Sequence, residues 1–266
     1  MPLAQMTLEH VSKVYTVSTR PPGLQGALRG AFRRSVKRIE AVQDLSFTIE
    51  PGELLGYIGP NGAGKSTTIK LMSGILVPDA GRIEILGRTP WKQRVDHVSE
   101  IGVVFGQRSQ LWWDTPVRDS FELLRDIYAV SHADYRRRLD ELVELLQAGD
   151  LLETPVRQLS LGQRMRCEFI AALLHHPKIL FLDEPTIGLD AVTKLAMRDF
   201  LIRLNRSGVT LILTTHDMDD IESLCRRVMV IGHGRLLFDG DMERLRSRYA
   251  PHRILKARLR DEVPAP

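Results

Sequence analysis

The stretch that decides the fold is Gly59-Pro60-Asn61-Gly62-Ala63-Gly64-Lys65-Ser66-Thr67, which fits the pattern G-x-x-x-x-G-K-[ST]. An apolar run at 54–58 precedes it and a helical pattern begins at Ser66, so we expect a loop between a buried strand and a helix. The glycines allow the backbone to fold round a phosphate chain, with N–H groups at the positive end of the helix. Lys65 can then reach the β- and γ-phosphates, and the Ser66 hydroxyl can ligate Mg²⁺. The stretch therefore predicts a nucleoside triphosphate site.

Further motifs follow the loop in a defined order. They are Gln107 after Val103-Val104-Phe105, Leu159-Ser160-Leu161-Gly162-Gln163-Arg164, Ile179-Leu180-Phe181-Leu182-Asp183-Glu184-Pro185, Gly188-Leu189-Asp190, and Leu211-Ile212-Leu213-Thr214-Thr215-His216. This order resembles the ATP-binding subunits of ABC transporters, and the resemblance covers about residues 5–245. It implies an ATPase that uses Mg²⁺. It also implies an α/β fold, the P-loop ABC ATPase fold, with a mainly parallel core sheet, a small antiparallel β-subdomain and a helical subdomain.

The acidic strand end and the histidine are candidate catalytic groups. Asp183 ends an apolar run, where its carboxylate can hold Mg²⁺, and in the family it usually does so through water. Alternation turns the side chain of Glu184 differently, towards the attacking water, so we expect it to act as general base or to position that water. By resemblance, His216 contacts the γ-phosphate and Glu184, whereas Gln107 touches Mg²⁺ and the lytic water.

The signature stretch is expected to act on a second subunit. Ser160 and Gly162 precede a helix that starts at Gln163, and a helix N-terminus offers N–H groups to an anion. The resemblance places these residues against the ATP of a partner cassette, in a head-to-tail pair where Asp190 crosses the interface. Leu161 replaces the usual first glycine of a Gly-Gly pair, so the backbone there must tolerate a side chain.

One segment departs from the family pattern. Tyr15 resembles the aromatic residue that stacks on adenine, but it lies 44 residues before Gly59. An insertion at 16–39 explains the gap, and its spacing of apolar residues among arginines predicts a short basic amphipathic helix. Its apolar positions are Leu24, Leu28, Phe32, Val36 and Ile39. The helix can pack on its own domain or serve a membrane partner, and the residues alone leave both open.

The remaining patterns outline the domains. Residues 5–14, 42–50 and 82–86 predict antiparallel strands, and the apolar runs at 54–58, 101–105, 179–183, 210–214 and 228–231 predict buried parallel strands. Helical patterns at 119–129 and 134–146 fall in an expected helical subdomain at 108–163. We therefore expect an ATP-binding domain at 1–250 and a basic tail at 251–266.

Composition limits the class of protein. The chain has 37 basic and 33 acidic residues, a net charge of +4 that is too small to indicate nucleic-acid binding. No apolar run approaches the roughly 20 residues that span a bilayer, and no signal peptide is recognisable. The basic insertion and tail can face anionic lipid, although a solvated surface explains the tail equally well. Cys167 and Cys225 have no metal-binding or redox spacing, which favours two inert thiols.

Two aromatic pairs remain. Trp112 and Trp113 follow Gln107 and suit either a contact with a membrane subunit or core packing. His175 and His176 precede Pro177, which is typical of a solvated helix end.

Three features most resemble the multidrug and viologen exporter branch: the stretch 105–114, the stretch Thr186-Ile187-Gly188-Leu189-Asp190 and the insertion at 16–39. The resemblance implies an ATPase that powers export through a separate transmembrane permease. Its expected partners are that permease and a second ATP-binding subunit, with a homodimer favoured, and its expected location is the cytoplasmic face of the membrane, bound peripherally. The rival interpretation is a non-transport ABC ATPase acting on ribosomes, DNA or iron–sulfur assembly. The single cassette and the short helical region count against that rival.

Overall fold

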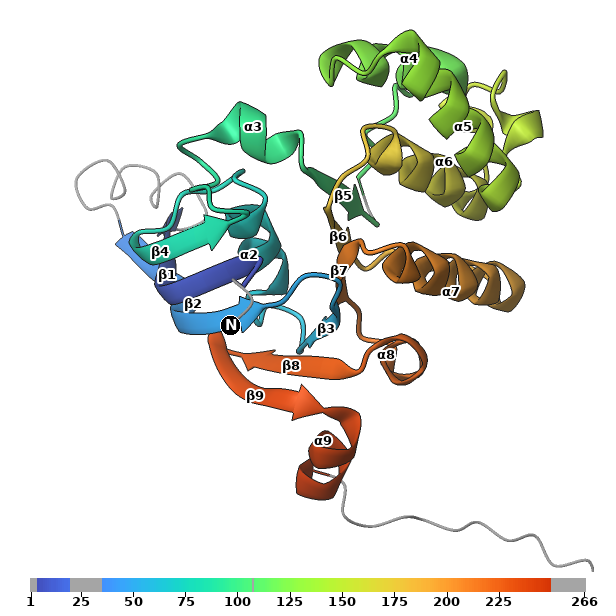
Figure 1. Ribbon diagram of the computed structural model, residues 1–266. Coiled ribbons are helices and arrows are strands. Elements are labelled where there is room, and N and C mark those ends of the chain that lie inside the picture. The colour runs from blue at the N-terminus through green and yellow to red at the C-terminus, as the bar shows by residue number, and fades with distance from the viewer. Residues whose placement is uncertain (1–3, 20–34, 107, 250–266) are drawn as a thin grey trace, which may run out of the picture.

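The computed structural model describes residues 4–19, 35–106 and 108–249, which form two sheets surrounded by helices (Figure 1). The larger sheet has the order β5-β6-β7-β3-β8-β9, in which the first five strands are parallel and β9 is antiparallel to β8. Its strands are β3 (Leu54–Ile58), β5 (Ile101–Phe105), β6 (Ile179–Asp183), β7 (Thr210–Thr214), β8 (Arg227–Gly232) and β9 (Arg235–Asp241). The apolar runs predicted as parallel strands are confirmed.

The two faces of this sheet bury different partners, because side chains alternate along a strand. Leu180 and Leu182 of β6 belong to a core shared with the helices α6, α7 and α8. Ile179 and Phe181 belong to a second core, shared with α2 and the smaller sheet. The carboxyl ends of the parallel strands therefore meet at one edge between two packed layers, where α/β proteins bind ligands.

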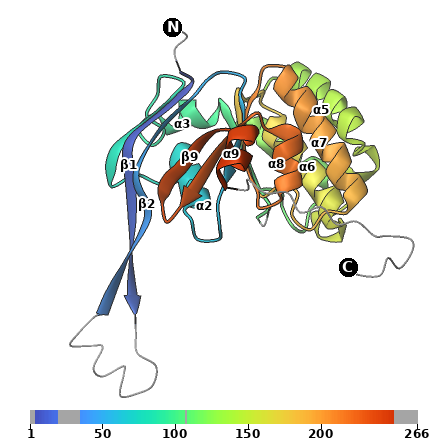
Figure 2. The ribbon, with the colours of Figure 1, turned by 90° about the horizontal axis from the view of Figure 1, so that it is seen from below.

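The smaller sheet is antiparallel, with the order β2-β1-β4. Its strands are β1 (Met6–Thr19), β2 (Ser35–Ile49) and β4 (Ala80–Ile85). The predicted antiparallel strands are confirmed, but the β1–β2 ladder continues as far as the pair Thr19 and Ser35. Figure 2 shows this extension projecting beyond the body of the molecule.

The ladder corrects one prediction about the insertion. Val36 and Ile39 were expected on an amphipathic helix, but both lie on β2, opposite Ser18 and Tyr15 of β1. Pairing with a distant strand overrides the local helical spacing. Leu24, Leu28 and Phe32 lie outside the described residues, as do Gln107 and the tail at 251–266.

Helices form a separate layer over β5 and β6. They are α4 (Val117–Ile127), α5 (His132–Leu146) and α6 (Leu161–Leu173), with short 3₁₀ turns at Gly149–Leu151 and Val156–Gln158. Leu139, Leu142 and Leu146 of α5 are buried, which confirms its predicted apolar face. α6 continues beyond the predicted boundary at 163 and packs against both α4 and α5.

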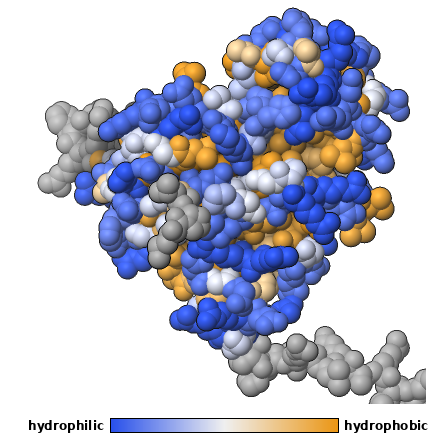
Figure 3. Space-filling model, viewed as in Figure 1, coloured by the Kyte–Doolittle hydropathy of each residue, from blue (hydrophilic) through white to orange (hydrophobic). Residues whose placement is uncertain are grey.

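The other helices flank the larger sheet. They are α2 (Lys65–Met72), α3 (Arg94–Val98), α7 (Ala191–Arg206), α8 (Met218–Leu224) and α9 (Met242–Tyr249). In the part of the chain that the structure describes, no helix is long and apolar enough to cross a membrane. Hydrophilic residues cover most of the face in Figure 3, and apolar patches lie mainly towards its centre.

Two predictions about aromatic side chains are settled by burial. His175 is not solvated: its ring stacks on Tyr128 with centroids 3.8 Å apart, and its Nε2 lies 2.8 Å from the carbonyl oxygen of Ile101. His176 is exposed as expected. Trp112 and Trp113 are 43% and 53% exposed, so the core-packing alternative is wrong. Cys167 and Cys225 are buried free thiols, as expected.

Candidate active site

The phosphate-binding loop joins β3 to α2, as predicted. Gly64 is the N-cap of α2 and has φ 109°, and a Cβ there would lie 2.3 Å from the Ala41 carbonyl oxygen, so only glycine fits. No side chain caps α2, which leaves the N–H groups of its first turn available to an anion. The Lys65 ammonium donates to the carbonyl oxygens of Gly59 at 2.6 Å and Pro60 at 3.2 Å. These contacts keep the positively charged Lys65 ammonium group against the backbone of the phosphate-binding loop.

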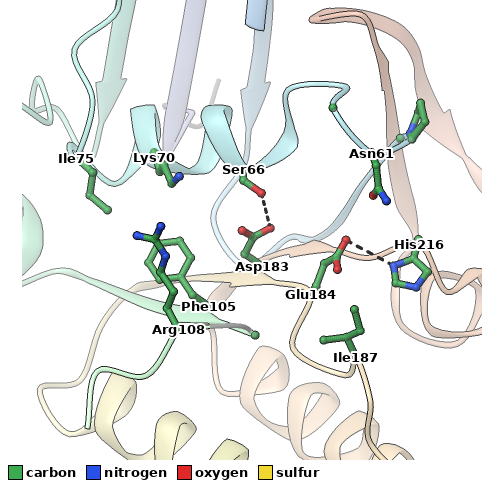
Figure 4. A pocket seen from close by; sticks show the side chains of 14 residues that line it. Asn61, Ser66, Lys70, Ile75, Phe105, Arg108, Asp183, Glu184, Ile187 and His216 are labelled. Atoms are coloured by element: carbon green, nitrogen blue, oxygen red, sulfur yellow. Dashed lines mark hydrogen bonds and ion pairs between the residues drawn. The ribbon is translucent and has the colours of Figure 1, made fainter. Parts of the chain in front are cut away.

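A hydroxyl and a carboxylate meet beside this loop. Ser66 Oγ donates to Asp183 Oδ1 at 3.2 Å (Figure 4). Thr214 Oγ1 donates to the same oxygen at 2.6 Å. Asp183 is opposite Thr214 in the β6–β7 ladder, so sheet pairing positions the carboxylate. Oxygen ligands of this kind are those that Mg²⁺ prefers. The pair Ser66 and Asp183 therefore fits the predicted Mg²⁺ site.

Glu184, the residue directly after β6, contacts the predicted histidine His216. Glu184 Oε1 lies 3.5 Å from His216 Nδ1, at the ends of neighbouring strands. Glu184 has φ 54°, a left-handed conformation that costs energy for a residue with a side chain. Its N–H donates to the Thr214 carbonyl oxygen at 3.0 Å and to Thr214 Oγ1 at 3.2 Å, which holds that backbone in place.

These groups line one cavity of about 890 Å³, large enough for a nucleotide. Its lining comprises Gly59, Pro60, Asn61, Gly62, Ser66, Lys70, Ile75, Phe105, Gly106, Arg108, Asp183, Glu184, Ile187 and His216. Most of the predicted loop, the predicted Mg²⁺ ligands Ser66 and Asp183, and the predicted catalytic residues Glu184 and His216 thus line the same cavity. Ala63, Gly64, Lys65 and Thr67 form the loop and the start of α2 behind it.

Sequence reasoning missed several lining residues. Lys70 lies one helical turn after Ser66, so the spacing on α2 could have indicated it. Phe105 and Arg108 flank Gly106 and Gln107, within a stretch that had already been singled out. Ile75 and Ile187 gave no signal, because apolar residues in loops are common.

The signature stretch lies elsewhere, at the N-terminus of α6. Ser160 and Gln163 form a capping box: Gln163 N–H donates to Ser160 Oγ at 3.2 Å, and Ser160 N–H donates to Gln163 Oε1 at 2.8 Å. Neither residue, nor Gly162, lines the cavity. The side chain of Leu161 lies against Gly188, where an added Cβ would come within 2.8 Å of Leu161 Cδ2. Gly188 thus accommodates the departure at Leu161.

Two other predicted residues also lie outside the cavity lining. Asp190 caps α7, accepting from Thr193 N–H at 2.9 Å. Tyr15 lies on β1, opposite Ile39. Its stacking on adenine stays a prediction, as does the partner contact of Asp190. Gln107 lies outside the described residues. The described residues contain no group of three or more metal-binding side chains of the His, Cys, Asp or Glu type.

Comparison with known proteins agrees with this geometry. The family model described as ABC transporter matches residues 42–187. The chain is similar to the ABC transporter ATP-binding protein NatA of Bacillus subtilis, with 31% identity over 80% of this chain and 87% of that protein. It is also similar to the Nod factor export ATP-binding protein I of Burkholderia pseudomallei, with 34% identity over 87% and 74%. The methionine import ATP-binding protein MetN of Geobacillus kaustophilus is 35% identical over 89% and 66%.

Solved structures share the fold. An ATP-binding subunit of an ABC transporter superposes with a TM-score of 0.77 at 24% identity, over 92% of this chain and 93% of the other. A dimeric ATP-binding cassette in a post-hydrolysis state, bound to ADP and Pi, superposes with a TM-score of 0.74 at 25% identity, over 89% and 98%.

Proposed function

Because this chain belongs to the ABC transporter family, as an ATP-binding subunit that hydrolyses ATP, we propose that it powers export through a separate transmembrane permease. The contact of Glu184 with His216, beside Ser66 and Asp183, carries the catalytic part of the proposal. Relatives named for Nod factor export and daunorubicin resistance favour export, whereas a relative named for methionine import keeps the direction open to test.

The residues divide the work of hydrolysis. Lys65 and the N–H groups of α2 bind the β- and γ-phosphates. Ser66 and Asp183 would hold Mg²⁺, which offsets negative charge on the phosphates. Glu184 accepts a proton from the attacking water, and His216 holds Glu184 and the γ-phosphate in place. We assign Gln107, which lies outside the described residues, to the metal and the lytic water by resemblance.

We assign the second half of the site to another copy of the chain. Ser160, Gly162 and Gln163 present a helix N-terminus outside the cavity of their own chain, which suits a phosphate bound by a partner. A similar solved structure is a dimeric cassette bound to ADP and Pi, which supports pairing of two cassettes, and we propose that the pair is head-to-tail. In that pair Asp190 would lie at the interface.

Two variants separate the halves. Lys65→Ala removes the cation beside the phosphates, so ATP binding by the isolated subunit should weaken. Ser160→Arg should leave that binding near normal and block both dimerisation and hydrolysis, because its bulk and charge occupy the partner-facing surface. Titration with a fluorescent ATP analogue and size-exclusion chromatography measure the two effects. An equal loss of ATP binding in both variants would show that the two-subunit site is wrong.

Capture of membrane proteins on the tagged chain tests the permease. We expect mass spectrometry to identify a protein with several membrane spans, whereas ribosomal or iron–sulfur scaffold proteins would support the rival class.

The exposed side chains of Trp112 and Trp113 are proposed as part of the contact with the permease. Changing both to Ala should reduce permease recovery and leave ATP affinity unchanged. Comparing uptake and release of the substrate in oriented vesicles then settles the direction of transport.

We propose that the projecting β1–β2 arm serves the membrane partner rather than ATP, at the cytoplasmic face of the membrane. Its described part exposes the apolar Val17, Val36 and Ile39 together with the basic Lys37 and Arg38. Mixed apolar and basic surface suits anionic headgroups, where each cation contributes about 1 kcal/mol.

The pairing register of β1 and β2 shows where the end of the arm can be deleted. Thr19 and Ser35 are direct partners, so a two-residue Asn-Gly turn can replace residues 20–34 without cutting either strand. We expect ATP hydrolysis by the subunit to survive, while permease assembly and binding to phosphatidylglycerol vesicles fall. A weaker ATP affinity with normal assembly would assign the arm to the nucleotide site instead.

A further inference from the structure

A fully buried carboxylate lies just behind the catalytic pair. Asp220 of α8 is 0% exposed, yet both of its oxygens have partners. Oδ2 accepts from Thr186 Oγ1 at 2.6 Å, and Oδ1 accepts from Arg198 Nε at 2.6 Å. A carboxylate buried without partners is strongly unfavourable, so these two contacts define where Asp220 can sit.

Asp220 connects the two chain segments that leave the site. Thr186 comes two residues after Glu184, and Asp220 comes four residues after His216. On the other side of the catalytic pair, Asp183 and Thr214 are partners in the β6–β7 ladder. The chain segments that carry Glu184 and His216 are therefore joined twice. The β6–β7 ladder joins them before the catalytic pair, and Asp220 joins them after it.

A second ionic contact reinforces the same arrangement. Lys194 Nζ lies 2.8 Å from Asp217 Oδ2, directly after His216. Lys194 and Arg198 are one turn apart on α7, so one face of α7 contacts both the N-cap residue and the first turn of α8. The Lys194–Asp217 pair is 28% and 27% exposed, so solvent weakens it relative to the buried Arg198–Asp220 contact.

The catalytic histidine needs such support. The side chain of His216 is 61% exposed, so packing constrains it little. Its position therefore depends on the backbone between β7 and α8. Asp217 and Asp220 hold that backbone against α7, and Asp220 also holds it against the Glu184 loop, which is the segment 184–190 between β6 and α7.

We propose that Thr186, Asp220 and Arg198 form a positioning cluster that sets His216 against Glu184, which rests on the catalytic roles proposed above for that pair. None of the three lines the nucleotide cavity. The cluster should thus affect the rate of hydrolysis through geometry and leave ATP binding alone.

Thr186 offers the mildest test, because Thr186→Val removes the donor to Asp220 and nearly conserves shape at a site that is 2% exposed. Misplacing a catalytic group by about 1 Å can cost about 10²-fold, so we expect kcat to fall by about 10- to 10²-fold. The KM for ATP should stay nearly constant. Thr186→Ser keeps the hydroxyl and should restore most of kcat.

Ser223→Ala is the matched control. Its hydroxyl donates to the carbonyl oxygens of Asp219 and Asp220 within α8 and makes no link to the Glu184 loop. This variant should keep the wild-type kcat and KM. Thermal midpoints of all variants report any general loss of stability, which should not follow kcat.

Glu184→Gln, measured alongside, separates the two levels of the proposal. Near-normal turnover in Glu184→Gln would overturn the catalytic assignment itself. Collapsed turnover in Glu184→Gln, together with a normal kcat in Thr186→Val, would overturn only the positioning cluster. Equal kcat losses in Thr186→Val and Thr186→Ser would also overturn it, because the hydroxyl would then not matter.

Discussion

Among the described residues, the N-termini of α2 and α6 both suit a phosphate, and they differ in what surrounds them. The first turn of α2 has no side-chain cap and opens into a cavity with Asp183, Glu184 and His216. The first turn of α6 is closed by the Ser160 capping box and lies outside that cavity. The N-terminus of α2 therefore lies beside acidic and histidine side chains that can take part in hydrolysis. The N-terminus of α6 offers a binding surface but has no such side chains from the cavity beside it.

The middle and far end of α6 are anchored by buried contacts, whereas Ser160 at its N-terminus is exposed. Glu168 is 3% exposed and accepts from Ser109 Oγ and from Gln110 N–H, in the segment after Gln107. His175, just beyond the helix, binds the carbonyl oxygen of Ile101 at the start of β5. A rigidly anchored helix with an exposed N-terminus is suited to present that end to another molecule. We infer that the difference reflects a site completed by a partner.

The strongest loss of ATP hydrolysis should come from a substitution at the α2 site. Glu184→Gln removes the base and preserves shape, so turnover should fall by about 10²–10⁴-fold while ATP binding is retained. The variant should also accumulate as an ATP-bound dimer, visible by size-exclusion chromatography. Near-normal phosphate release from the purified variant would contradict the assignment of Glu184 as the base. The α2 site would then no longer differ from the α6 N-terminus by its catalytic residue.

The anchor at the far end of α6 should be sensitive to pH. Burial lowers the pKa of His175 from 6.5 to about 4, opposed in part by its hydrogen bond to Ile101. The unfolded chain then binds more protons between these pH values, so the free energy of unfolding should fall as pH drops from 6.5 towards 4. The full effect amounts to about 3 kcal/mol.

Urea titrations across this range measure the slope. His175→Gln should flatten it, whereas His132→Gln, at an exposed position on α5, should not. An unchanged slope in His175→Gln would mean that this anchor does not govern the acid response.

The two serine caps provide the smallest effect and the closest comparison. Ser131 caps α5 through Asp134 N–H, as Ser160 caps α6. Changing either to Ala should lower stability by about 1 kcal/mol, measured from urea denaturation. Only Ser160→Ala should also slow hydrolysis, by about tenfold, because it would remove the hydrogen bond proposed between Ser160 and the partner's phosphate. Equal ATPase rates in the two variants would reduce Ser160 to a structural cap.

The sequence was most informative where local pattern and chemistry coincide. The phosphate-binding loop and the β6 strand end were predicted because an apolar strand must precede them and acidic or glycine residues must follow. The parallel strands followed from their apolar runs. The signal for each of these features is local in the chain, so each could be recognised before its distant partners were known.

Three of the failures involve distant partners. Val36 and Ile39 have helical spacing, but pairing with β1 makes them a strand. His175 looked solvated because its partners, Ile101 and Tyr128, lie far away in the chain. The Asp220 cluster left no motif at all, since it joins three segments through a single carboxylate.

The inference of a partner-completed site can be tested by cross-linking. One chain would carry Asn61→Cys, at the exposed loop of the α2 site, and the other Ser160→Cys, both with Glu184→Gln to hold ATP. The native thiols should not interfere, because burial raises the pKa of Cys167 to about 12 and that of Cys225 still further. A short bis-maleimide is then added to the mixed chains, with and without MgATP.

A covalent heterodimer should form with MgATP and be nearly absent without it, because only ATP brings the two helix ends together. Chains carrying Ser131→Cys in place of Ser160→Cys serve as the control and should not cross-link. No heterodimer with MgATP, or an equal yield without it, would contradict the claim that Ser160 completes the site of a second subunit.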